Sequence, residues 1–384
     1  MAQSIRLVLI IACLQGFIYI VHSKCDGKCV PLAECKSNDF GGENFFDLRA
    51  GIDDEVEVDC DHYLEVCCDI EDVVTTSRPI DPVSAAPREP PPSGGPPTIE
   101  NCGKRNGHGA GFRIKNAQNE AEFGEFPWMV AISSGNGFDD SDSKYICGGS
   151  LIRGDVVLTA AHCVVNRTTE KLTVRAGEWD TKTTNEILPY QDLLVTKIVV
   201  HENYNPVFHF NNIALLYLER EFDADEHVQL ICLPPQGKQF DGQNCVATGW
   251  GKDNFYSENY QVILKKVELP VWTKEKCQAD LRKTRLGPRF ALHNSFTCAG
   301  GEEGKDTCTG DGGSPLVCED VDQPNKYYQA GIVAWGVGCG QAGVPGVYTK
   351  NSLYTNWIQQ QLEVRNSDNL NSDKLNSDNP NYDY

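Results

Sequence analysis

Two short stretches of the chain carry the residue types that acyl-transfer chemistry uses. His162 lies in Leu158-Thr-Ala-Ala-His-Cys163, and an aspartate and a serine lie in Cys308-Thr-Gly-Asp-Gly-Gly-Ser-Pro-Leu-Val-Cys318. In such chemistry a histidine takes a proton from a serine hydroxyl, an acid orients the histidine, and backbone N–H groups hold the oxyanion. The two stretches lie far apart in the chain, so the fold must bring them together.

The elements available to position them are short strands. From Cys102 to about Val364 the chain is dense in β-branched runs separated by Gly, Pro, Asn and Asp; the runs start at Trp128, Asp155, Lys171 and Gly331. Many short strands with turn signals between them predict an all-β barrel or sandwich. Only the end of this region, residues 353–364, has a helical pattern.

Seven motifs, in order, resemble those of chymotrypsin-like serine proteases. Besides the two stretches above they are Gly124-Glu-Phe-Pro-Trp128, Cys147-Gly-Gly-Ser-Leu-Ile152, Asn212-Ile-Ala-Leu-Leu216, Thr248-Gly-Trp-Gly251 and Pro345-Gly-Val-Tyr-Thr-Lys350. They cover about 250 residues. The resemblance implies two packed six-stranded β-barrels with the active site between them.

Two of the three residues of the catalytic triad differ from the family pattern. His162 matches the family histidine, but Asn212 stands where the family has aspartate and Gly312 stands where it has the nucleophilic serine. Glycine has no side chain to attack a carbonyl, and loss of the nucleophile costs on the order of 10⁶ in turnover in a measured protease. The amide of Asn212 can favour the wrong histidine tautomer, which costs roughly 10⁴ in a related example. We therefore expect an inactive protease homologue.

Other parts of the machinery match the family. Asp306 falls at the acidic base of the primary specificity pocket of trypsin-like members, and Gly310 and Gly312 retain N–H groups for an oxyanion. Ser314, two residues after the nucleophile position, is the hydroxyl considered as a possible substitute that would give a residual trypsin-like activity. We expect it to point elsewhere, because a nucleophile must lie within about 3 Å of the histidine nitrogen.

Activation also departs from the family pattern. Family members are cut before Ile-Val-Gly-Gly, and the new amine pairs with the aspartate that corresponds to Asp311. Here Arg113 is followed by Ile114-Lys-Asn-Ala117, so Lys115 would have to enter a buried site. Cleavage by an upstream trypsin-like protease is expected within or just after a proline-rich linker, and its candidate sites are Arg78, Arg88, Arg105 and Arg113.

The remaining segments predict a secreted, acidic protein. Residues 1–23 have the pattern of a cleaved secretory signal, residues 71–101 form the extended linker, and residues 365–384 form a disordered tail with repeated Asn-Ser-Asp. The net charge of −20 argues against nucleic acid and anionic membranes as partners. Sixteen of the 17 cysteines remain after the signal, which predicts a disulfide framework.

Residues 24–70 resemble the clip domain of arthropod clip-domain serine proteases. With Gly312 the chain is most similar to the inactive homologues of the prophenoloxidase-activating-factor type. The protease-like domain then spans 102–364. The resemblance implies eight disulfides: Cys25–Cys67, Cys29–Cys60, Cys35–Cys68, Cys102–Cys232, Cys147–Cys163, Cys245–Cys318, Cys277–Cys298 and Cys308–Cys339.

Two further sites are expected. Asn166-Arg-Thr168 is a glycosylation sequon. Glu178, Asp180 and Glu186 lie in a loop that binds calcium in some family members, and oxygen ligands at short spacing suit Ca²⁺. The alternative is a solvated acidic loop, and no cofactor is required otherwise.

The resemblance implies a zymogen-like cofactor of melanisation in innate immunity, secreted into haemolymph and working without catalysis. Its expected partners are prophenoloxidase, the activating clip-domain protease of that enzyme, or both, with assembly into an oligomer after cleavage as a further expectation. The chief alternative is an adhesion or pattern-recognition protein that binds microbial surfaces on the same inert scaffold. A weak trypsin-like enzyme is the third.

Overall fold

The computed structural model describes residues 28–31, 65–68, 101–107, 109–110, 119–135, 144–169, 172–183, 186–252 and 260–364. The chain divides into two compact units, Met1–Pro90 and Pro91–Tyr384. The expected signal and tail, and the expected linker up to residue 100, lie outside the described residues, as do Arg78, Arg88 and Arg113.

The first unit contains one antiparallel strand pair among its described residues, β1 (Lys28–Pro31) and β2 (Glu65–Cys68). The register places the Cα of Cys29 opposite that of Cys67. The side chains of these strands, and with them the three expected disulfides of this unit, lie outside the described residues.

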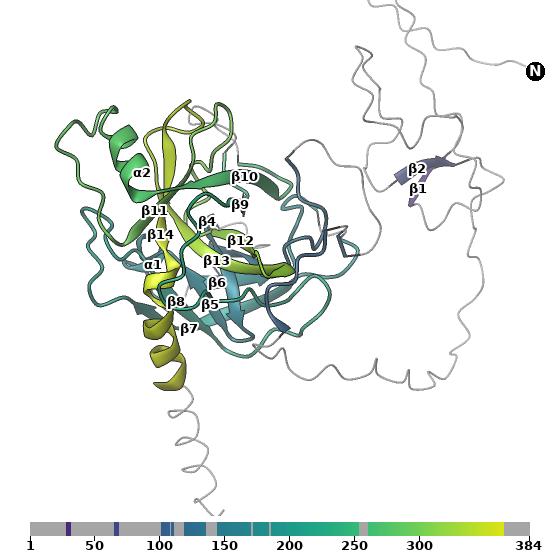
Figure 1. The fold of residues 1–384 in the computed structure, drawn as a ribbon. Helices are drawn as coiled ribbons and strands as arrows, with labels where there is room; N and C mark the ends of the chain where they lie inside the picture. Colours follow the sequence, from purple (N-terminus) through teal and green to yellow (C-terminus); the bar gives the residue numbers. More distant parts are fainter. Residues whose placement is uncertain are drawn as a thin grey trace, which may run out of the picture. The chain divides into compact units, whose positions relative to one another are not determined.

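The second unit is built on two closed β-barrels (Figure 1). The first has the order β3-β4-β5-β8-β7-β6. Its strands are β3 (Met129–Ser134), β4 (Lys144–Arg153), β5 (Val156–Thr159), β6 (Leu172–Ala176), β7 (Gln191–Val200) and β8 (Ala214–Leu218). Every residue of β5 and β8 is buried, which explains why these strands read as unbroken apolar runs rather than as alternating ones.

The second barrel has the order β10-β11-β14-β13-β12-β9. Its strands are β9 (Asn244–Gly249), β10 (Lys265–Trp272), β11 (Phe296–Gly300), β12 (Pro315–Asp320), β13 (Gln323–Trp335) and β14 (Pro345–Lys350). Closure of both sheets pairs their edges, which would otherwise be open to other chains. The predicted double six-stranded barrel is confirmed.

Helices are few but more numerous than the sequence pattern predicted. The C-terminal helix is confirmed at 355–364, after the short turn η4 (Asn351–Leu353). The expectation that only this end is helical is wrong, because α1 (Ala161–Val164) and α2 (Lys274–Leu281) are helical too. The hydroxyl of Thr273 caps α2 by accepting from the backbone N–H of Lys276 at 3.3 Å. No helix among the described residues is long and apolar enough to cross a bilayer.

Disulfides tie the barrels internally and to the residues that precede them. The structure forms five of the pairs that the resemblance implies: Cys102–Cys232, Cys147–Cys163, Cys245–Cys318, Cys277–Cys298 and Cys308–Cys339. Cys102–Cys232 closes the longest loop, with a sequence separation of 130 residues. In the chain-entropy description, a loop of this length gives a large stabilisation, about 4–5 kcal/mol.

Candidate functional site

Three strand ends bring His162, Asn212 and Gly312 together. His162 lies in α1 directly after β5, and Asn212 lies just before β8. Thr159 at the end of β5 pairs with Ala214 in β8, so the two side chains meet at one end of the first barrel. Gly312 precedes β12 of the second barrel, and its carbonyl accepts a hydrogen bond from Gly148 N–H of the first barrel at 3.0 Å.

Asn212 fixes the orientation and tautomer of His162. Oδ1 of Asn212 accepts from the backbone N–H of His162 at 2.9 Å, so its Nδ2 is the group that faces the imidazole Nδ1, at 2.8 Å. An amide NH₂ can only donate, so Nδ1 must accept and the ring proton lies on Nε2. A serine protease needs the opposite tautomer, with Nε2 free to accept a proton.

The imidazole is held neutral. Burial, together with the neighbouring His209, lowers the pKa of His162 to about 4. The rings of His162 and His209 lie edge to face with their centroids 5.7 Å apart. A neutral His162 with its proton on Nε2 can donate to a ligand at the site but cannot act there as a general base.

The imidazole of His162 occupies part of the space that a side chain at position 312 would need. A Cβ built on Gly312 would lie 2.9 Å from His162 Nε2, closer than real Cβ contacts come. The imidazole thus lies close against the glycine backbone. Ser314 does not replace the missing hydroxyl, because its side chain is fully buried and its Oγ packs against Gly148. No hydrogen bond joins Ser314 to His162, both of which the structure describes.

Asp311, the family's partner for an activating amine, is a buried carboxylate bound by backbone donors. It accepts from Gly251 N–H and from Cys308 N–H, both at 2.8 Å. Burial raises the pKa of Asp311 to about 6, while these two hydrogen bonds act in the opposite direction. No ion pair to Asp311 occurs among the described residues, and residues 111–118, which include Ile114 and Lys115, lie outside them.

Asp306, the residue expected at the base of a specificity pocket, is held by backbone donors. Its Oδ1 accepts from Thr307 N–H at 2.9 Å and its Oδ2 from Gly340 N–H at 3.1 Å. Burial raises the pKa of Asp306 to about 6 against the effect of these bonds. Both carboxylate oxygens are therefore engaged by the local backbone.

An aromatic ring that the sequence pattern did not predict packs against Gly310, one of the two glycines expected to hold an oxyanion. Gly310 has φ +100°, a conformation that favours glycine. The ring of Tyr260 lies directly against it, where a Cβ could not fit. The hydroxyl of Tyr145 donates to the Gly310 carbonyl at 3.0 Å. No short-range pattern links Tyr260 or Tyr145 to Gly310, since both lie far from it in the sequence.

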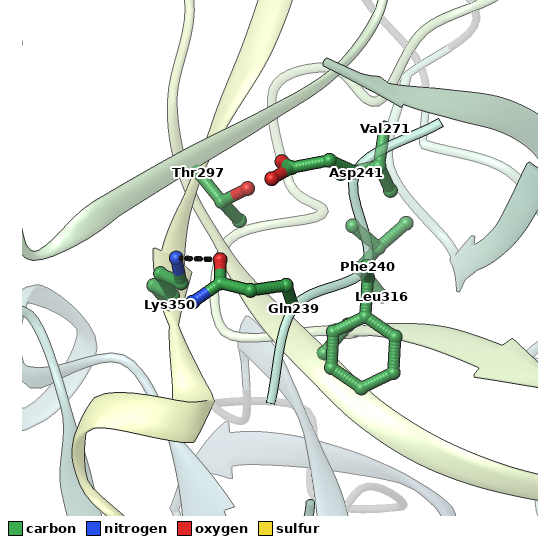
Figure 2. Close-up of a pocket in the computed structure, with 8 residues that line it drawn as sticks. Gln239, Phe240, Asp241, Val271, Thr297, Leu316 and Lys350 are labelled. Carbon is green, nitrogen blue, oxygen red and sulfur yellow. Dashed lines mark hydrogen bonds between the residues drawn. The ribbon is translucent and has the colours of Figure 1, made fainter. Parts of the chain in front are cut away.

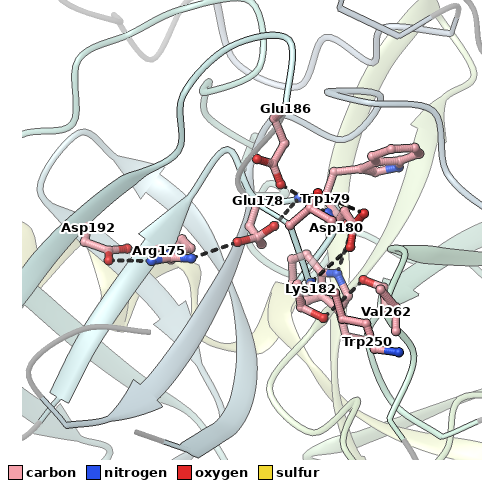
Figure 3. Close-up of polar contacts among 11 residues, drawn as sticks. Arg175, Glu178, Trp179, Asp180, Lys182, Glu186, Asp192, Trp250 and Val262 are labelled. Atoms are coloured by element: carbon pink, nitrogen blue, oxygen red, sulfur yellow. Dashed lines mark hydrogen bonds and ion pairs between the residues drawn. The ribbon is translucent and has the colours of Figure 1, made fainter. Parts of the chain in front are cut away.

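The expected calcium loop is organised around an arginine (Figure 3). Arg175 contacts Glu178 at 3.1 Å and Asp192 at 2.7 Å. Burial raises the pKa of Glu178 to about 8, and the adjacent Glu186 raises it as well. Asp180 is used differently: it accepts from Lys182 N–H at 3.0 Å and from the Thr183 hydroxyl at 3.1 Å.

These contacts do not fit the three-carboxylate calcium site that the sequence suggested. Among the described residues, the only cluster of three groups spaced to share a metal ion is Cys147, His162 and Cys163. Two of those are joined as a disulfide, so that cluster offers no thiolate ligands either. At Glu178, Arg175 supplies the positive charge that a calcium ion was expected to supply.

Two other expected sites can be placed. Asn166 is exposed, as a glycosylated residue must be. Arg105 is not the exposed cleavage site that we expected. Its guanidinium donates to the buried Glu125 at 3.0 Å and lies 4.9 Å from the centre of the Phe126 ring. A protease would have to break this partly buried ion pair to reach the bond.

A small cavity lies away from these residues, at the second barrel (Figure 2). Its lining includes Phe240, Leu316 and the pair Lys350–Gln239, joined by a 2.6 Å hydrogen bond. The space open to a water-sized molecule is about 10 Å³, which suits a single water. It is too small for a substrate.

The comparisons with known proteins agree with this geometry. The trypsin family model matches residues 115–358, and the model of the serine protease clip domain of PPAF-2 type matches residues 20–69. The chain belongs to the clip-domain serine protease homologues of the trypsin family.

Members of this family that are similar to the chain include both activating factors and inactive proteases. Phenoloxidase-activating factor 2 of Galleria mellonella is 51% identical over 73% of this chain and 96% of its own length. Inactive CLIP domain-containing serine protease A28 of Anopheles gambiae is 37% identical over 88% of this chain and 89% of its own length. Phenoloxidase-activating factor 3 of Holotrichia diomphalia is 34% identical over 66% of this chain and 73% of its own length.

Proposed function

We propose that this clip-domain serine protease homologue is a secreted, non-catalytic cofactor of a phenoloxidase-activating cascade. The observation that carries the proposal is the centre itself: Gly312 offers no hydroxyl, and Asn212 holds His162 in a tautomer whose Nε2, the nitrogen that faces position 312, already carries a proton. Without a nucleophile, the remaining way for the domain to act is by binding. The choice of cascade is inferred from its relatives, which include phenoloxidase-activating factors.

The proposed partners are prophenoloxidase and the clip-domain protease that activates it. An upstream trypsin-like protease first cleaves the chain, and only then does it bind these partners. The cut lies in the linker, at Arg78 or Arg88, or after it, at Arg113. A cut at Arg78 or Arg88 separates the clip domain from the protease-like domain, because both sites precede Cys102 and its disulfide to Cys232. A cut at Arg113 leaves both pieces joined through that disulfide. Haemolymph is the expected location.

Reconstitution tests the proposal. The processed protein is mixed with the activating protease and prophenoloxidase, and phenoloxidase activity is compared with the mixture that lacks this chain. We expect stimulation, and no stimulation would reject the cofactor function. The matched variant His162→Ala should stimulate equally, because binding does not need the imidazole as a base. If a correctly folded His162→Ala protein loses stimulation together with turnover of arginine peptides, the protein is an enzyme.

A further inference from the structure

The helix α2 and the segment after it form a basic region in an otherwise acidic chain. Residues 274–290 contain six Lys or Arg and two acids, a local charge of +4 (6 − 2) against −20 for the whole chain. Lys276 and Lys283 both contact Asp280, so part of this charge is neutralised locally. The other four cations of this region are exposed to solvent.

Three arginines of this region lack acidic partners. Arg282, Arg285 and Arg289 are exposed, and no ion pair to any of them occurs among the described residues. The Nε of Arg282 donates to the carbonyl of Phe290 at 2.7 Å, which fixes one end of the segment. Guanidinium groups bind carboxylates through paired hydrogen bonds, so exposed arginines suit an anionic ligand.

An exposed apolar tip lies beside this basic region. In the β7–β8 loop, Val207 is 75% and Phe208 is 61% exposed. Phe208 stacks on Phe210 at a centroid distance of 5.4 Å, and Phe210 stacks on His293 at 4.0 Å. His293 follows Arg289 by four positions, so the Phe210–His293 contact joins the tip of the first barrel to the segment that carries the arginines.

The tip is held in a defined conformation. The side-chain oxygen of Asn205 accepts from the backbone N–H groups of both Val207 and Phe208, each at 3.0 Å. Asn211 Nδ2 donates to the Asn203 carbonyl at 2.7 Å across the base of the loop. These bonds keep two large apolar side chains in solvent, where burial against a partner would stabilise them.

We propose that this basic–aromatic surface (Val207, Phe208 and the exposed arginines 282, 285 and 289) docks an acidic segment of a partner protein that also carries apolar side chains. The proposal rests on the proposed binding function and adds the chemistry of the partner. Charge complementarity calls for carboxylates, and the tip calls for Leu- or Phe-like groups. A sulfated polysaccharide would satisfy the arginines but would leave Phe208 in water, so a peptide is favoured.

The test measures binding to the full-length protein directly, by fluorescence anisotropy. The probes are three labelled synthetic peptides of equal length: one of Glu and Phe, one with each Glu replaced by Lys, and one with each Phe replaced by Ser. We expect only the first to bind well, more weakly as salt rises. The double variant Arg285→Ala/Arg289→Ala should weaken its binding by roughly tenfold.

Matched variants separate this surface from a general charge effect. Arg220→Ala/Lys305→Ala removes the same charge from exposed residues that already pair with Asp223 and Glu302, and it should bind as the unmodified protein does. Val207→Ser should weaken binding, whereas Val321→Ser, at an equally exposed valine, should not.

Three results would overturn the proposal. They are equal loss in the two charge variants, equal binding of the peptide without Phe, and binding of heparin that depends on the arginines but not on Val207. Peptide binding is measured without the cascade, so its failure is distinguishable from failure of the proposed function. Absence of stimulation with intact peptide binding rejects the cofactor function only; stimulation with no peptide binding rejects the surface only.

Discussion

Nδ2 of Asn212 lies 2.8 Å from Nδ1 of His162, while Oδ1 of the same amide accepts the backbone N–H of that histidine at 2.9 Å. The two contacts use both ends of one amide, so the amide cannot rotate without losing one of them. The histidine is thereby oriented as in a protease and protonated on the wrong nitrogen for one.

Replacement of Asn212 by aspartate should raise the pKa of His162 from about 4 by roughly 1–3, because a carboxylate 2.8 Å away favours the imidazolium. NMR titration of labelled histidine rings measures this change. Asn325→Asp, at an exposed residue, is the control and should leave His162 unaffected. An unchanged pKa in Asn212→Asp would show that the amide does not control the ring.

Restoring the nucleophile alone should not restore a protease. Gly312 does not have a positive φ, so serine is allowed there, but its Cβ meets His162 Nε2 at 2.9 Å. We expect Gly312→Ser to react weakly with a fluorophosphonate probe and Gly312→Ser/Asn212→Asp to react faster, since the aspartate corrects the tautomer. Labelling of the unmodified protein that requires Ser314 would contradict the assignment of an inert centre.

The buried Asp311 should make the free energy of unfolding decrease as the pH rises from about 4 to about 6. Its pKa is about 6 in the native protein and about 4 when unfolded, so between these values the native state binds more protons. Its contribution to stability is therefore present below pH 4 and is lost as the pH rises through 6. Relative to the unmodified protein, Asp311→Asn should gain about 2–3 kcal/mol in unfolding free energy between pH 4 and 7.

Urea unfolding of both proteins across that pH range gives the comparison. Exposed Asp322→Asn is the matched control and should show no such pH-dependent gain. A constant difference between Asp311→Asn and the unmodified protein would mean that Asp311 is ionised throughout.

Calcium should not stabilise the protein. Arg175 already supplies a positive charge to Glu178, and the carboxylate of Asp180 accepts a hydrogen bond from the N–H of Lys182 in its own loop. We expect the midpoint of thermal unfolding to be the same in millimolar calcium and in EDTA. A rise with calcium but not with magnesium would show that Glu178 and Glu186 rearrange into a site, which the observed contacts do not provide.

Local patterns predicted the fold well because the barrels depend on strands whose apolar runs are visible in the sequence. The runs at Trp128, Asp155, Lys171 and Gly331 lie in β3, β5, β6 and β13. Helix α2 escaped prediction because it has only two buried residues, Cys277 and Leu281, and so no apolar stripe. Its one local signal is the capping residue Thr273.

The parts of the site that the sequence did not predict are contacts across long separations. The missing side chain at Gly312 could be read from a motif, but the close approach of His162 to it could not. The sequence also did not predict three other contacts, which are Tyr260 with Gly310, Arg105 with Glu125, and Arg175 with Glu178. Each depends on side-chain placement that the two barrels determine together.

Gly312 also affects how long a peptide strand bound at this site would stay there. In an active protease, a bound strand is cut and its products leave, so occupancy ends with reaction. Beside His162 a bound strand would stay intact, and its residence would be set by its dissociation rate alone. The fold that releases cut fragments in active proteases would here hold an intact partner reversibly.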